Sequence, residues 1–185
     1  MRGDPQQALA SCNQLAEIAK AAGNPAMETL LAHDLGMGKF MAGEFDEAIE
    51  HFDRALNARK RTSFEQTLKV HTADVQIVDT AMRCWALVLK SPDEALVRQE
   101  LDEAVAAARD EEHDFSRCFA LNILATAHQP ISDTHTILQR VEMGLTISNQ
   151  HKFSYWNAWS AIIGGWAKAR SGNPAEGISE IRSGF

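Results

Sequence analysis

Apolar residues recur at intervals of three and four through most of the chain, which is the period of an amphipathic α-helix. In the stretch 73–90, for example, Val75, Val78, Met82 and Trp85 fall on one stripe. The strict alternation of apolar and polar residues that is typical of strands is almost absent. The pattern and its breaks predict helices over residues 4–22, 26–42, 45–58, 73–90, 92–110, 114–128, 132–149, 153–171 and 174–185.

Proline, glycine and asparagine mark the boundaries between these helices. Gly23-Asn24-Pro25 and Gly172-Asn173-Pro174 each place a proline in the first turn of the next helix, where its missing N–H costs nothing. Ser91-Pro92-Asp93-Glu94 combines a capping residue with an acidic first turn. Residues 59–72 form the one long connection, within which 63–70 is expected to add a helical turn.

Small residues predict where neighbouring helices touch. Gly36 and Ala48 lie twelve residues apart across a turn, and so do Gly165 and Gly177. In an antiparallel helical hairpin such positions meet where the backbones are closest, so a minimal side chain is favoured there although a mid-helix glycine costs about 1 kcal/mol. Phe45 and Phe52 are expected to pack over the first of these crossings.

Each predicted helix has only one or two apolar faces, so each hairpin must stack on its neighbours to bury them. We therefore expect an all-α, right-handed solenoid of stacked antiparallel helical hairpins. The second helices begin about 40–48 residues apart, which gives a repeat length of about 40. One domain would span residues 1–185, as a half-hairpin followed by four hairpins: 1–22, 26–58, 73–110, 114–149 and 153–185. Both ends resemble cut repeats, which predicts an excised fragment of a larger protein.

Two segments resemble a known family. Leu35-Gly36, Gly43-Glu44-Phe45, Ala48, Phe52 and Ala55 match most of the tetratricopeptide signature, although one aromatic is displaced to Phe40 and another is replaced by Ala32. The segment 155–184 and His113-Asp114-Phe115-Ser116 are similar to the C-terminal helical-repeat region of large bacterial signalling proteins. Those proteins join an adenylate or guanylate cyclase domain, or a protein kinase or winged-helix domain, to a predicted ATPase. The resemblance covers essentially the whole chain, but Ser91 stands where a glycine is usual.

Composition narrows the functional classes. The chain has 185 residues, 45% of them hydrophobic, so it can bury a core. Its formal net charge of −7 disfavours nucleic acid as a partner, because neutralising phosphates requires clustered lysine and arginine. The small cluster Arg59-Lys60-Arg61 follows a predicted helix end, where positive charge suits the helix dipole. No apolar run approaches the roughly 18 residues of a membrane span.

Candidate chemistry is sparse. The chain has three cysteines, an odd number, and no CxxC pair: Cys12, Cys84 and Cys118. This predicts reduced thiols in the cytoplasm, and we expect Cys84 and Cys118 to be buried. Among seven histidines there is no HExxH motif, although His128 and His135 flank a turn and are close enough in sequence to approach each other. No phosphate-binding GxxxxGK[ST] loop occurs. We expect no catalytic residues, no cofactor and no metal.

The first helices of stacked hairpins line a concave surface, and Gly36 and Gly165 set the register of two of them. The residues expected to face this groove and bind a partner are His33, Met37, Phe40, Phe119, Asn122, Thr126, Trp159, Ile162 and Trp166.

Trp156, Trp159, Ile163 and Trp166 lie near one helix face. Three interpretations stay open: core between repeats, an aromatic anchor for a partner, or a face that absent repeats would cover and that otherwise favours a homodimer.

The function expected is a non-catalytic protein-interaction scaffold or regulatory repeat region. It would bind a protein or peptide, or other domains of the same chain, through the concave face. A small-molecule sensor that gates an attached ATPase or cyclase is an alternative, and it predicts a closed apolar pocket. A homo-oligomerisation module is another.

Overall fold

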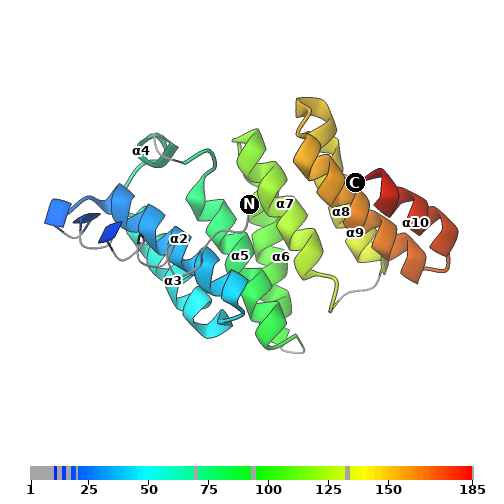
Figure 1. Ribbon diagram of the computed structural model, residues 1–185, viewed down its shortest axis with the longest axis horizontal. Helices are drawn as coiled ribbons and strands as arrows, with labels where there is room; N and C mark the ends of the chain where they lie inside the picture. The colour runs from blue at the N-terminus through cyan, green and yellow to red at the C-terminus, as the bar shows by residue number, and fades with distance from the viewer. Residues whose placement is uncertain are drawn as a thin grey trace.

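The structure is a computed structural model that describes residues 21–68, 71–92, 95–131 and 134–184, together with residues 11, 14, 15, 18 and 19. Every regular element in this part of the chain is helical, which confirms the all-α prediction (Figure 1). The helices are α2 (Pro25–Ala42), α3 (Phe45–Arg59), α4 (Phe64–Leu68), α5 (Val75–Lys90), α6 (Ala95–Asp110), α7 (Asp114–Ala127), α8 (Thr134–His151), α9 (Ser154–Arg170) and α10 (Pro174–Ser183).

From residue 26 onward the predicted helices agree with the observed ones to within a few residues. The helical turn expected within 63–70 is present as α4. Most of the predicted helix 4–22 and its half-hairpin lies outside the described residues, as do Asp93 and Glu94 of the predicted cap.

Capping and boundary residues act at several helix ends. The Asn24 side chain accepts a hydrogen bond from the Ala26 amide at 3.0 Å, with Pro25 in the first turn of α2. Gly43 ends α2 in the left-handed region at φ 79°, a conformation that costs glycine little. Asp74 caps α5 by accepting from the Gln76 amide at 2.9 Å. Asn173 precedes α10 without a side-chain cap bond.

The helices follow one another in a row from α2 and α3 at one end to α9 and α10 at the other (Figure 1). Helix α2 packs on α3, α8 packs on α9, and α9 packs on α10. Helix α5 contacts α2, α3, α6 and α7, and α7 contacts α5, α6, α8 and α9. Helices α5 and α7 are therefore enclosed by neighbours, whereas α10 packs mainly on α9.

Glycines mark two close approaches in this row, and the expected meeting of Gly165 with Gly177 is confirmed. A Cβ atom added to Gly165 would lie 2.5 Å from the Gly177 carbonyl oxygen, so α9 and α10 touch backbone to backbone. A Cβ atom on Gly36 would lie 2.6 Å from the ring of Phe52, which is fully buried. Phe45 packs edge-on to Phe40, with ring centroids 5.6 Å apart. Small residues therefore set how closely these helices pair.

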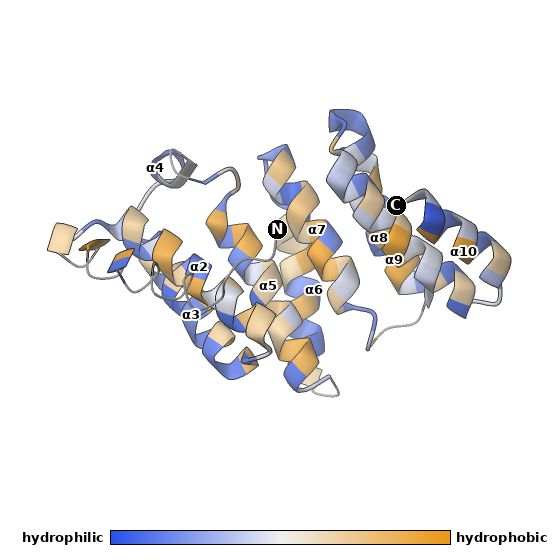
Figure 2. Cartoon of the chain, viewed as in Figure 1, coloured by the Kyte–Doolittle hydropathy of each residue, from blue (hydrophilic) through white to orange (hydrophobic). Residues whose placement is uncertain are grey.

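The main hydrophobic core runs through the middle of the row. Phe52, Leu101 and Leu124 are almost completely buried in it. A smaller core joins α7, α8 and α9 through Ile137 and Ile163. Figure 2 shows apolar residues concentrated on α5 and α7, whereas α3 is mainly hydrophilic. The enclosed helices thus carry the apolar surface whose burial stabilises the fold, at about 25 cal/mol per Å².

Candidate functional site

The residues expected to line the groove lie on α2, α7 and α9, and they differ in exposure. Met37, Phe119, Trp159, Ile162 and Trp166 are partly exposed. The remaining residues are buried: His33, Phe40, Asn122 and Thr126. In this structure, only the first group is open to direct contact with a partner.

Asn122 and Thr126 join helices instead of facing solvent. The Ser160 hydroxyl donates to Oδ1 of Asn122 at 2.6 Å, and Asn122 Nδ2 donates to the Cys118 carbonyl at 2.9 Å. The Trp159 indole N–H donates to Oγ1 of Thr126 at 2.8 Å. A buried polar group must be hydrogen-bonded to avoid a desolvation cost. The bonds from Ser160 and Trp159 connect α9 to α7, whereas the bond between Asn122 and Cys118 lies within α7.

The aromatic series on α9 divides between core and surface. Trp156 is 5% exposed and packs on Phe119 with ring centroids 4.7 Å apart. Trp159 and Trp166 are partly exposed, and the guanidinium of Arg170 lies 5.2 Å from the Trp166 ring. Tyr155, one residue before Trp156, is 65% exposed. The core interpretation therefore holds for Trp156, while Trp159 and Trp166 present part of their surface to solvent.

A buried acid–base pair joins α2 to α5. His33 Nδ1 lies 2.6 Å from Oδ1 of Asp79, and the Asp79 side chain is fully buried. Its second oxygen, Oδ2, has no hydrogen-bond partner among the described residues. The His71 ring packs edge-on to His33 with centroids 4.9 Å apart.

This environment shifts both pKa values of the pair upward. Burial alone would lower the pKa of His33, but the hydrogen bond and charge of Asp79 outweigh it and raise that pKa above its ordinary value. Burial raises the pKa of Asp79, and His33 offsets this only in part. The pair consequently binds protons more tightly than the two side chains do when they are exposed to water.

Cys84 and Cys118 are 3% and 0% exposed, which confirms that they are buried; Cys12 lies outside the described residues. Burial raises the pKa of each of these two thiols to about 12. Both stay protonated at neutral pH, so neither has the thiolate that nucleophilic or metal-binding chemistry needs.

His128 and His135 are bonded to different partners. The His128 Nδ1 lies 2.6 Å from the Leu124 carbonyl oxygen, whereas His135 is exposed and bonds Gln139 on α8. Across the described residues, no three or more His, Cys, Asp or Glu side chains are arranged to hold a metal ion.

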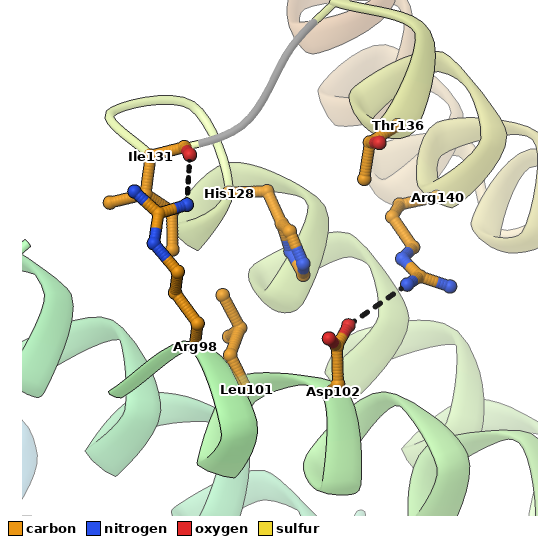
Figure 3. A pocket seen from close by; sticks show the side chains of 7 residues that line it. All are labelled: Arg98, Leu101, Asp102, His128, Ile131, Thr136 and Arg140. Atoms are coloured by element: carbon orange, nitrogen blue, oxygen red, sulfur yellow. Dashed lines mark hydrogen bonds and ion pairs between the residues drawn. The ribbon is translucent and has the colours of Figure 1, made fainter. Parts of the chain in front are cut away.

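A cavity of about 260 Å³ lies where α6, α7 and α8 meet (Figure 3). Its lining consists of Arg98, Leu101, Asp102, His128, Ile131, Thr136 and Arg140. Sequence analysis did not single it out, because Arg98 and Arg140 are far apart in the chain and form no local motif.

Two ion and hydrogen-bond contacts frame the cavity. Arg98 donates through Nη1 to the Ile131 carbonyl, and Arg140 donates through Nη2 to Oδ1 of Asp102 at 3.1 Å. The Nε atom of Arg140 is buried and has no partner in the described part of the chain. His128, 3% exposed, points between these two contacts in Figure 3. Burial lowers its pKa, only partly opposed by the bond to Leu124, so its ring is neutral at neutral pH.

No helix of the described residues combines the length and the apolarity that crossing a membrane requires.

In comparisons with known proteins, no family model matches the chain, and no curated protein matches it.

Proposed function

We propose that this chain is a non-catalytic protein-interaction scaffold, built as a tetratricopeptide-like right-handed solenoid. The observation that carries the proposal is the order of packing. Helices α2, α5, α7 and α9 contact one another in succession, while α3 packs on α2 and α5, α6 on α5 and α7, and α8 on α7 and α9. Stacked hairpins of this kind present the first helix of each hairpin along one continuous surface, which suits an extended or helical peptide.

Partly exposed aromatic side chains on this surface supply the anchors. Phe119 lies on α7, and Trp159 and Trp166 lie on α9. Tryptophan is enriched among the few interface residues that carry most of the binding energy. The Trp159 ring is held by its bond to Thr126, so little side-chain entropy would be lost when a partner packs on it.

The sequence resemblance supports a more specific setting. A helical-repeat region of a bacterial cyclase–ATPase or kinase–ATPase protein would work in the cytoplasm and would regulate catalytic domains of its own chain or recruit a partner. Any catalytic activity would then belong to other parts of that protein.

The test is a pull-down from lysate of the source cells, with bound proteins identified by mass spectrometry. The double variant Trp159→Ala, Trp166→Ala removes two anchors, and loss of about 2 kcal/mol at a hot spot weakens binding roughly thirtyfold. Leu96→Ala is the matched control, because Leu96 is 61% exposed on α6, away from the first helices.

A partner that the control retains and the double variant loses supports the proposal, provided that circular dichroism shows both variants folded. The scaffold proposal fails if captured proteins are indifferent to the double variant, or if Leu96→Ala removes them equally. Sedimentation of the chain alone at several concentrations tests the alternative of self-assembly, which requires mass to rise with concentration.

A further inference from the structure

The cavity between α6, α7 and α8 carries positive charge within an acidic protein. Its lining includes two arginines, Arg98 and Arg140, against one carboxylate, Asp102, although the chain as a whole has a formal net charge of −7. The two guanidinium groups come from different helices and lie on opposite sides of the cavity in Figure 3. We propose that this cavity binds hydrogen phosphate, a tetrahedral oxyanion that still carries one O–H group at neutral pH.

Hydrogen-bond donors are in excess around the cavity. A guanidinium has five N–H donors. Within the described ranges, Arg98 donates to the Ile131 carbonyl and Arg140 donates to Asp102. The buried Nε–H of Arg140 has no acceptor among the described residues. A buried donor without an acceptor is unfavourable, and guanidinium groups bind oxyanions through parallel N–H···O bonds, so these groups suit a bound phosphate.

The first turn of α8 adds to the positive electrostatic potential in the cavity. This helix begins at Thr134 and runs for 18 residues, and Thr136 from its first turn lines the cavity. A helix N-terminus carries partial positive charge, which is favourable to an anion.

His128 sets the preference for a protonated anion. A carbonyl oxygen can only accept, so the 2.6 Å contact with Leu124 requires that Nδ1 carry the proton. In the neutral ring Nε2 is then an acceptor, and the side chain points into the cavity in Figure 3. Asp102, on α6, is a second acceptor in the lining. Hydrogen phosphate can donate its O–H to one of these acceptors while its other oxygens accept from the arginines, whereas sulfate, fully ionised, has no proton to donate.

The experiment is isothermal titration of the full chain at pH 7.5 and low salt with inorganic phosphate, and separately with sulfate. Phosphate is expected to bind saturably at one site, at least tenfold tighter than sulfate. Arg98→Gln and Arg140→Gln are each expected to weaken phosphate binding at least tenfold. Arg109→Gln is the matched control, since it removes the same charge from α6 outside the cavity lining.

A phosphomonoester without free hydroxyl groups, such as methyl phosphate, distinguishes the source of the phosphate. It is mostly fully ionised at pH 7.5, because its second pKa is about 6, so it is expected to bind as weakly as sulfate. Tighter binding of the ester than of inorganic phosphate would overturn the assignment to the free ion.

Two readouts address the role of His128. His128→Gln keeps a side-chain acceptor and is expected to retain the preference for phosphate over sulfate, whereas His128→Phe is expected to reduce it, because Asp102 is then the remaining one of the two acceptors. If His128→Phe does not fold, the methyl phosphate titration of the unaltered chain decides, because a fully ionised ester cannot donate a proton to Nε2.

Absence of saturable binding up to millimolar phosphate would overturn the proposal. Equal binding of phosphate and sulfate, or equal loss with Arg109→Gln, would overturn it as well, because either result indicates attraction to net charge alone.

Discussion

At the scale of single residues, the His33–Asp79 pair makes the stability of the fold depend on pH. Both pKa values are raised in the folded chain, so the folded state binds more protons than the unfolded state. Stability then falls as pH rises. The His33 contribution is fully present below the unfolded histidine pKa of about 6.5 and is lost as pH rises through the higher folded value. His71 and Asp34 are the neighbouring titratable groups, and they contribute less than the partner itself.

We predict that Asp79→Asn removes this dependence. From pH 6 to pH 8.5 the free energy of unfolding of the unaltered chain should fall relative to that of the variant, because the folded pair binds protons more strongly than the unfolded chain does. Urea unfolding at both pH values measures the difference. Asp34→Asn is the control, because Asp34 is exposed, and it should keep the slope of the unaltered chain. An unchanged slope in Asp79→Asn would contradict the prediction.

Two glycines in helices should respond in opposite directions to the same substitution. A Cβ atom on Gly165 would lie 2.5 Å from the Gly177 carbonyl oxygen, so Gly165→Ala should destabilise the fold by about 1–3 kcal/mol through overpacking. A Cβ atom on Gly38, within α2, would have nothing within 4 Å. Gly38→Ala should therefore stabilise by about 0.5–1 kcal/mol, the helix-propensity gain alone. Thermal unfolding of both variants tests this, and destabilisation by Gly38→Ala would show that α2 packs differently.

At the scale of elements, the start of α5 is held more firmly than the start of α2. The Asp74 carboxylate accepts from the Gln76 amide and also pairs with Arg59, whose Nη2 lies 3.3 Å from Oδ2. Both of these charged side chains are only 11% exposed. Arg59 in addition donates to the Thr62 carbonyl at 2.7 Å. The end of α3, the connection containing α4 and the start of α5 are thus joined through one ion pair.

Removing the two caps should show this difference. Asn24→Ala loses one capping bond and should cost about 1 kcal/mol. Asp74→Ala loses a cap and leaves a largely buried Arg59 without its carboxylate, so about 2–3 kcal/mol is expected. Urea unfolding compares the two variants, and Asp46→Ala in α3 serves as an exposed acidic control. Equal losses in the two cap variants would mean that the Arg59 pair adds nothing.

Sequence could predict the helices because their ends depend on local chemistry. Pro25 and Pro174 fix their own φ angle, and Gly43 adopts a left-handed conformation that other residues rarely take, so their effect needs no tertiary information. The pairing of Gly165 with Gly177 was also within reach, since a hairpin fixes which positions oppose each other.

Interactions between distant residues could not be predicted in this way. His33 and Asp79 lie 46 positions apart in the sequence, and Arg98 donates to the carbonyl of Ile131, which is 33 positions away. The burial of Asn122 and Thr126 could not be predicted for the same reason, because it depends on contacts with a distant helix. The helical period assigns them to one face of α7, but only the packing shows that α9 covers that face.

At the scale of the whole molecule, the row of helices should make stability uneven from centre to end. Helix α7 contacts four other helices, whereas α10 packs mainly on α9, and Gly177 is the one buried residue among those described in α10. In arrays where each unit contacts its neighbours, terminal units can open without unfolding the rest.

Hydrogen exchange followed by mass spectrometry is expected to show the slowest exchange in α7 and fast exchange in α10. Denaturant at low concentration should increase exchange in α10 before α7 changes. Protection of α10 equal to that of α7 would indicate a single cooperative unit instead.

The distribution of tryptophan gives the molecule a built-in optical probe. Three of the four indoles lie on α9, as Trp156, Trp159 and Trp166, and the fourth, Trp85, lies on α5. Intrinsic fluorescence therefore reports chiefly on α9 and its neighbours, with Trp156 emitting from an apolar environment and Trp159 and Trp166 accessible to a quencher such as acrylamide. A ligand or peptide that covers α9 would shield those two rings and shift their emission to shorter wavelength, while events confined to α3 would leave the spectrum nearly unchanged.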